Sequence, residues 1–197
     1  MLTRCALILL LAIPGVVLAD AGNGDFMGYQ LGDQYQRGRD TRQQTSTTGN
    51  LLISAEQPVK PGDIAEVTLL ATAETLTIGY IGASQWLATE AEAREMGRRY
   101  FELLQAKYPD WPYGWEVMDA RMNVVEVNFN SAPYNLRLRL TEDQHEGENM
   151  WRFSMTLGWL PGSAEEEAWR NQAIDEQIAE KLDTRQELLK KSDVRGL

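Results

Sequence analysis

Residues 125–157 read VEVNFNSAPYNLRLRLTEDQHEGENMWRFSMTL. Every second residue is apolar in three runs of this stretch, which is typical of antiparallel strands that bury one face. The apolar positions are Val125, Val127 and Phe129, then Tyr134, Leu136, Leu138 and Leu140, and finally Trp151, Phe153, Met155 and Leu157. The sequence therefore predicts a three-stranded meander with its apolar side turned towards a core.

The register of this meander follows from keeping the apolar faces aligned, because a slip of one residue turns a whole strand inside out. The faces stay aligned across the first turn when Phe129 lies opposite Tyr134. The same register places Glu126 opposite Arg137 on the polar face.

An arginine cluster is predicted on the polar face of the meander. Extending the register across the second turn places Arg139 opposite Arg152, where two like charges repel each other. The pair therefore needs an acid from elsewhere or a bound anion. Two interpretations stay open: the arginines extend into water or pair with acids of the C-terminal helix, or they form a carboxylate or phosphate site. The residues of that site would be Arg137, Arg139 and Arg152, with Asn128 as a neutral partner.

Three shorter apolar runs precede the meander. They cover residues 51–53, 64–71 and 76–80. The link between the last two runs is short, which predicts a hairpin. In the last run Leu76, Ile78 and Tyr80 alternate, so all three are expected on one face of the sheet.

The strongest helix signal follows this hairpin. Thr89 and Glu92 have the spacing of a capping box, and the helix is expected to end at Tyr108, before Pro109. The apolar residues with helical spacing are Met96, Tyr100, Leu103 and Leu104. The pattern predicts an amphipathic helix that packs one face against the sheet.

A long C-terminal helix is predicted over residues 163–191, with a second capping box at Ser163 and Glu166. Its apolar stripe is thin and consists of Trp169, Ile174, Ile178, Leu182 and Leu189. Such a helix lies across a domain edge, or it projects to contact a partner or a second copy of the chain. The sequence leaves both interpretations open.

Together these elements predict a single α+β domain over residues 51–197, with antiparallel strand groups, a central amphipathic helix and a long C-terminal helix. The preceding segment, residues 22–50, is expected to be partly flexible. Within it, the apolar island at residues 26–32 is expected to dock on the core, and residues 37–50 are expected to form a long polar loop.

The N-terminus has the features of a signal peptide. Arg4 precedes an apolar run from Ala6 to Leu18, and small residues follow. The run is shorter than the roughly 20 residues with which a helix crosses a bilayer. We expect residues 1–21 to be removed by cleavage after Ala19 or Ala21, which leaves a mature chain with no transmembrane segment.

Composition limits the compartment and the ligands. The only cysteine, Cys5, lies in the signal segment, so the mature domain has no thiol for a disulfide, a nucleophile or a metal site. This feature and the short signal favour a Gram-negative periplasm. The formal net charge of −10 argues against binding to nucleic acid or to anionic membrane surfaces, because both favour clustered Lys and Arg.

An aromatic turn, YPDWPYGW at residues 108–115, follows the central helix. Its rings either close one end of the core, as Trp and Tyr often do, or form a surface that stacks on sugar faces or grips a peptide. The residues of that surface would be Trp111, Tyr113 and Trp115.

No catalytic constellation stands out. The single histidine, His145, lies in an acidic turn, which does not favour a Ser-His-Asp arrangement, and one histidine cannot build a multi-histidine zinc site. The acidic turn at residues 142–148 lacks the ligand order of an EF-hand, and no phosphate-binding glycine loop is present. We therefore expect no cofactor and no metal, and the sequence favours a non-enzymatic role.

Two segments carry a resemblance to known proteins. FMGYQLG at residues 26–32 has an F-x-G-x-x-x-G-like pattern, and the central helix ends with LLQAKY at residues 103–108. In these features the first half of the mature chain resembles a loose class of uncharacterised exported proteobacterial proteins. The resemblance implies export and a non-enzymatic role, and it implies no particular functional residues.

The preferred function is that of an exported periplasmic binding or accessory protein, such as an inhibitor or envelope factor, that contacts an envelope protein. Self-association through the C-terminal helix belongs to the same interpretation. One alternative is a carboxylate-based enzyme or binder that acts on cell-wall sugars near the aromatic turn. Another is a carrier of small anions or other ligands at the arginine cluster.

Overall fold

The computed structural model describes residues 24–36, 42–45, 49–55, 61–119 and 124–194. The expected signal peptide and its cleavage site lie outside these residues.

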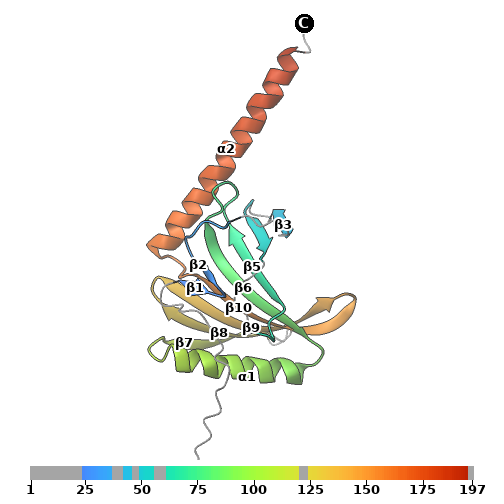
Figure 1. Ribbon diagram of the computed structural model, residues 1–197, viewed down its shortest axis with the longest axis vertical. Coiled ribbons are helices and arrows are strands. Elements are labelled where there is room, and N and C mark those ends of the chain that lie inside the picture. The colour runs from blue at the N-terminus through green and yellow to red at the C-terminus, as the bar shows by residue number, and fades with distance from the viewer. Residues whose placement is uncertain (1–23, 37–41, 46–48, 56–60, 120–123, 195–197) are drawn as a thin grey trace, which may run out of the picture.

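An eight-stranded antiparallel sheet forms the body of the protein (Figure 1). From one edge to the other the strand order is β3-β4-β5-β6-β10-β9-β8-β7. These strands are β3 (Arg42–Thr45), β4 (Leu51–Ser54), β5 (Glu66–Ala71), β6 (Ile78–Leu87), β7 (Tyr113–Asp119), β8 (Val124–Ser131), β9 (Tyr134–His145) and β10 (Glu148–Trp159). The other elements are the small hairpin of β1 (Asp25–Phe26) and β2 (Tyr29–Gln30), and the helices α1 (Glu90–Lys107) and α2 (Ala164–Val194). The predicted α+β class, with a central helix and a long C-terminal helix, is confirmed.

The two faces of the sheet differ because successive side chains point to opposite sides of the pleat. One face, here called the α1 face, packs against α1 and carries most of the core. Its fully buried residues include Leu69, Ile81, Val127, Phe129, Leu136, Phe153 and Met155. The other face, here called the polar face, carries the arginines of β9 and β10.

Helix α1 begins as its capping box predicts. The backbone N–H of Glu92 donates to the Thr89 hydroxyl at 3.3 Å, and the backbone N–H of Thr89 donates to the Glu92 carboxylate at 3.0 Å. The predicted residues Met96, Tyr100 and Leu104 are buried. Each large apolar side chain buried in this way stabilises the fold by about 1.5–3 kcal/mol, so this face fixes α1 on the sheet.

The N-terminal apolar island docks on the core, as predicted. Phe26 and Leu31 are almost fully buried, and Gln34 forms a bridge with Thr77, next to β6. Residues 42–45 were expected within a long polar loop but instead form β3, which pairs with β4. A polar sequence suits this position because β3 is an edge strand, where water can reach one side of the backbone.

The meander has the predicted faces but not the predicted register. Phe129 lies opposite Leu136 and not opposite Tyr134. The strands close up around a tight turn in which Ser131 pairs with Tyr134, and the pairing is therefore displaced by two residues. Because side chains alternate with a period of two, the apolar pattern alone does not distinguish these two registers.

Tyr80 lies on the polar face and not beside Ile78 on the α1 face, where it was expected. The pairing of β6 with β5 shifts after Leu70, and Gly79 is left as an extra residue between Ile78 and Tyr80. Such a β-bulge reverses the alternation of the residues beyond it. The glycine also leaves room for a ring from α2.

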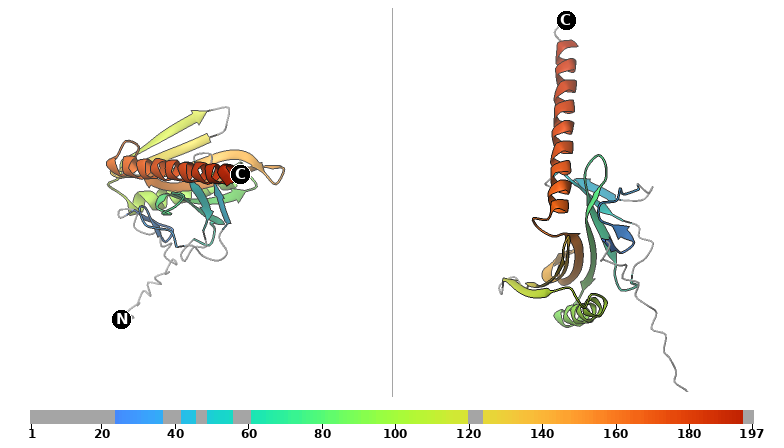
Figure 2. Two further views of the ribbon diagram at one scale, coloured as in Figure 1. Left: turned by 90° about the horizontal axis from the view of Figure 1, so that it is seen from above. Right: turned by 90° about the vertical axis from the view of Figure 1, so that its left-hand side faces the viewer.

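Helix α2 docks with its first half and projects with its second. The indole Nε1 of Trp169 donates to the backbone oxygen of Thr77 at 2.9 Å, and its ring meets that of Tyr80 edge-on at 6.0 Å between centroids. Residues 178–188 are exposed throughout, and the helix continues past the sheet as a single rod (Figure 2). The structure therefore favours the projecting form of this helix. In the described part of the chain, neither helix combines the length and apolar composition that crossing a membrane requires.

The start of α2 differs in one detail from the predicted capping box. The backbone N–H of Glu166 donates to the Ser163 hydroxyl at 3.2 Å, as expected, but the Glu166 carboxylate accepts from the backbone N–H of Gly162 at 2.6 Å. This backbone hydrogen bond lowers the pKa of Glu166. The negative charge is thereby held at the positive end of the helix dipole, where it is stabilising.

Alkaline pH is expected to destabilise the fold through Tyr100. Burial raises its pKa from 10.0 to about 12, although the nearby charge of Arg99 opposes the shift. Between these values the unfolded chain loses the phenolic proton while the folded chain retains it. The free energy of unfolding should therefore fall by about 1.4 kcal/mol per pH unit over this range. Urea denaturation at pH 9 to 12 measures this. The free energy of unfolding should fall less with pH in Tyr100→Phe than in wild type, and the control Tyr113→Phe, which changes an exposed tyrosine, should show the same fall as wild type.

Candidate functional site

The arginines predicted as a site share the polar face but have different partners. Arg139 lies opposite Glu126 on β8, whereas Arg152 lies opposite Thr141 on β9. The predicted opposition of Arg139 and Arg152 is therefore wrong. Its cause is the shift in register, because a displacement of two residues keeps the face and changes the partner.

Glu126 is the acid that the first two arginines need. Its side chain is 2% exposed, with Oε1 3.1 Å from Nε of Arg137 and Oε2 3.9 Å from Nε of Arg139. Asn128 completes the group: its amide donates to Glu126 Oε1 at 3.2 Å, and its oxygen accepts from Arg137 at 3.3 Å. One carboxylate therefore lies between two guanidinium groups, so the three side chains together keep one net positive charge.

Arg152 belongs to a separate stack on the same face. Its guanidinium carbon lies 5.5 Å from the ring centroid of Trp86, and its Nη2 lies 3.4 Å from the Ser84 hydroxyl. The Trp86 ring in turn stacks on His145 at 4.3 Å between centroids. The single histidine therefore has a ring partner on β6, which the sequence pattern did not indicate.

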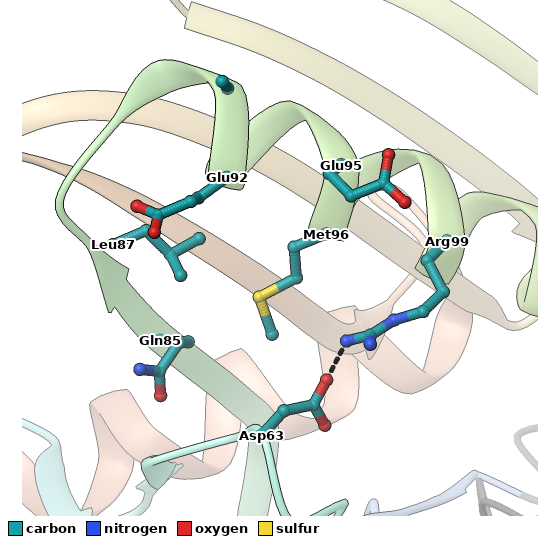
Figure 3. Close-up of a pocket in the computed structure, with 8 residues that line it drawn as sticks. Asp63, Gln85, Leu87, Glu92, Glu95, Met96 and Arg99 are labelled. Carbon is teal, nitrogen blue, oxygen red and sulfur yellow. Dashed lines mark hydrogen bonds and ion pairs between the residues drawn. The ribbon is translucent and has the colours of Figure 1, made fainter.

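A cavity of about 530 Å³ lies between the first half of α1 and strand β6 (Figure 3). Leu87 and Met96 contribute apolar surface to it, and three carboxylates line it. Asp63 pairs with Arg99, Glu95 pairs with Arg98 at 2.8 Å, and the third, Glu92, is held in the capping box.

The three carboxylates of this cavity are engaged in structural contacts. They are therefore not arranged as a free pair of acids for glycoside chemistry. The described part of the chain also contains no group of three or more His, Cys, Asp or Glu residues that could hold a metal ion.

The aromatic turn is divided between core and surface. Trp111 is half-buried and stacks on the buried Tyr108 at 4.7 Å between centroids. Tyr113 and Trp115 are instead 47% and 58% exposed. Trp111 therefore packs against the core, whereas Tyr113 and Trp115 are open to solvent.

The two exposed rings rest on a fixed aromatic base. Phe101 of α1 lies 5.3 Å from the ring centroid of Tyr113 and 5.1 Å from that of Trp115. The buried Phe129 of β8 lies 5.6 Å from Tyr113 and 5.7 Å from Phe101. Contacts between rings at these separations are favourable, so the base restricts the motion of the exposed rings.

These rings belong to the last strand of the sheet. β7 pairs with β8 on its inner side, and no described strand pairs with its outer side. Tyr113 and Trp115 are two residues apart and lie on the same face of the strand, level with the core residues Phe129 and Val127. We call Phe101, Tyr113 and Trp115, together with the free side of β7, the aromatic edge.

Sequence reasoning found the two exposed rings but missed Phe101. This residue lies outside the narrow helical stripe that predicted the buried face of α1, yet its position next to Tyr100 widens that stripe near the end of the helix. A wider apolar face at one end of α1 was the available signal that the turn after the helix packs against it.

Comparison of the chain with protein-family models, with curated proteins and with solved structures finds no match in any of the three. The functional proposal therefore rests on the surfaces described above.

Proposed function

We propose that this protein is an exported binding or accessory factor that holds an extended segment of an envelope protein at its aromatic edge. The observation that carries the proposal is the exposure of Tyr113 and Trp115 on the outermost strand of the sheet. Both the backbone and the side chains of this edge support it.

The backbone of β7 suits the addition of a strand. An edge strand presents N–H and C=O groups that can pair with another chain, and native proteins commonly protect such edges with charge or proline. The opposite edge, β3, has the polar sequence RQQT, whereas β7 begins with the aromatic sequence YGW. An extended segment added to β7 would gain main-chain hydrogen bonds, which is a recurrent mode of peptide recognition.

The side chains of the edge suit burial in an interface. Tyr and Trp are enriched at protein interfaces because each buries a large area with few rotatable bonds. Phe101 already restricts both rings, so binding costs little additional side-chain entropy. The contact is expected to depend on these two rings more than on the residues around them.

The compartment that we propose is the periplasm. The signal-like residues 1–21 and the lack of cysteine after Cys5 support export to a compartment in which the domain does not depend on disulfides. An envelope protein is then the accessible class of macromolecular partner.

We further propose that the protein associates with itself through α2. The projecting half of this helix carries large apolar side chains that nothing in the described chain covers. Exposed apolar rows of this kind mark contact surfaces in proteins.

Affinity capture with matched variants tests the proposed edge. Wild-type protein, Tyr113→Ser/Trp115→Ser and Leu52→Ser would each capture proteins from an envelope extract of the host. Leu52 is the control because it is also an exposed apolar residue, on a different strand. The double variant should bind the captured partner on the order of 100-fold more weakly, since each aromatic anchor contributes about 2 kcal/mol or less.

The control should retain the partner. The double variant loses the ring contacts with Phe101 and Phe129 and should be less stable than wild type, so its folded state at the assay temperature is checked by circular dichroism. A partner that binds the double variant as well as it binds the wild type would contradict the proposed edge.

A second candidate function, binding of cell-wall sugars, is favoured by one observation. Trp115 is 58% exposed, and an open aromatic ring can stack on the apolar face of a sugar. Calorimetric titration with soluble cell-wall glycan fragments tests it. Saturable binding that is lost in Trp115→Ser would support the sugar, and absence of heat with every fragment at two temperatures would contradict it.

A further inference from the structure

Helix α2 has one face that docks and one that does not. The docked face consists of Glu166, Trp169, Gln172, Ala173 and Glu176, all buried or half-buried. Positions 164, 167, 168, 171, 174 and 175, on the other side of the same turns, are all exposed. Even where α2 contacts the turn between β5 and β6, a second helix can therefore reach its outer face.

The outer face carries a row of large apolar residues. Ile174, Ile178, Leu182 and Leu188 are 46%, 51%, 53% and 62% exposed. The first three are four residues apart, and Leu188 follows Ile174 by about four turns, so all four lie along one side of the helix. The row runs from the docked half of α2 into its projecting half.

We infer that two copies of the chain pair through this row as antiparallel helices, with the two-fold axis close to the turn between Ile174 and Ile178. The inference rests on the self-association proposed above and is separate from binding at the aromatic edge. With 31 residues, α2 is about 46 Å long, which is enough for several turns of contact on each side of the axis.

Apolar side chains meet at the centre of this pairing and at its ends. Ile174 of one copy lies level with Ile178 of the other, which forms a four-isoleucine centre. Further from the axis, Leu188 lies level with Ala164, and Leu182 lies two residues from the level of Ala168. Large residues of the projecting half thus face small residues of the docked half, as interdigitating helices require.

Charge selects the antiparallel direction. The outer face carries Glu167 in the docked half and Lys181 and Arg185 in the projecting half, and all three side chains are exposed. In the antiparallel pair Arg185 lies level with Glu167 of the other copy, where the opposite charges attract each other. A parallel pair in register would instead place each of Lys181, Arg185 and Glu167 beside the same residue of the other chain, where like charges repel.

Sedimentation and site-directed crosslinking test the inference on the full chain. Wild type should sediment as a dimer at micromolar concentration, and Ile174→Ser/Ile178→Ser should raise the dissociation constant at least tenfold. The control is Ala179→Ser/Asp183→Ser, which changes exposed residues on another side of the same helix and should leave the dimer intact.

The relative direction of the two α2 helices is measured with cysteines introduced in a Cys5→Ser background, in which they are the only thiols. An oxidised mixture of Ala164→Cys and Leu188→Cys should give mixed disulfide dimers, whereas either variant alone should give none. A monomer at every concentration would overturn both the self-association and the arrangement. A dimer in which each variant crosslinks to itself would overturn the antiparallel arrangement and leave self-association standing.

Discussion

Gly79→Ala should lower the free energy of unfolding by about 2–3 kcal/mol, which is a large effect for the addition of one methyl group. A Cβ at this position would lie 2.1 Å from Cε2 of Trp169, so the indole must leave its place. Its hydrogen bond to Thr77 and its contact with Tyr80 would be lost with it. The φ angle of Gly79 lies outside the left-handed region, so alanine causes no backbone strain and the clash alone is measured.

A double-mutant cycle in urea isolates this clash. Trp169→Ala removes the indole, and in that background Gly79→Ala should cost less than about 0.5 kcal/mol. The replacement of glycine by alanine can even stabilise the chain slightly by restricting its unfolded state. Additive costs of the two changes would show that Gly79 does not hold α2 in place through Trp169.

Arg137→Met/Arg139→Met should destabilise the fold by about 3 kcal/mol or more. Methionine keeps an unbranched apolar chain over Glu126 but removes both positive charges, so the carboxylate stays covered and loses its ionic partners. A buried charge left without compensation costs several kcal/mol. Denaturation in urea at neutral pH measures the effect.

Removing the carboxylate as well should reverse most of this loss. In the triple variant Glu126→Met/Arg137→Met/Arg139→Met the group becomes apolar throughout, and such replacements of buried ion networks are often neutral or stabilising. Recovery in the triple variant would identify the uncompensated charge as the cause. A loss below about 1 kcal/mol in the double variant would show that water reaches Glu126 despite its low exposure.

The strands and helices were predictable from sequence because their signals are local. Alternation over residues 125–157 identified three strands and their buried faces, and the spacing of Thr89 and Glu92 identified the start of α1. Register was not predictable in the same way, because an apolar pattern of period two fits equally well after a shift of two residues. The turn around Ser131 and Tyr134 decided between the registers.

The candidate site was predictable only in part, because exposure depends on packing between distant elements. The sequence indicated that Trp111, Tyr113 and Trp115 form either core or surface, and α1 determines the outcome. Tyr108 at the end of that helix holds Trp111, while Phe101 supports the other two rings from one side and leaves them open on the other. A helical stripe does not show which neighbouring ring it will cover.

Pairing through α2 would change the geometry of binding. In the proposed pair each of the two domains carries its own aromatic edge. A partner with two extended segments, or a surface with many of them, would then be bound at two points, and the apparent affinity would rise without any new contact.

Hydrogen exchange of the backbone amides of β7 in the presence of the captured partner tests the aromatic edge most directly. If a partner segment adds to this strand, exchange should slow at residues 113–119, while the opposite edge, residues 42–45, should exchange at the same rate as in the free protein. Unchanged exchange in β7 together with slowed exchange in α2 or on the polar face would contradict the proposed edge.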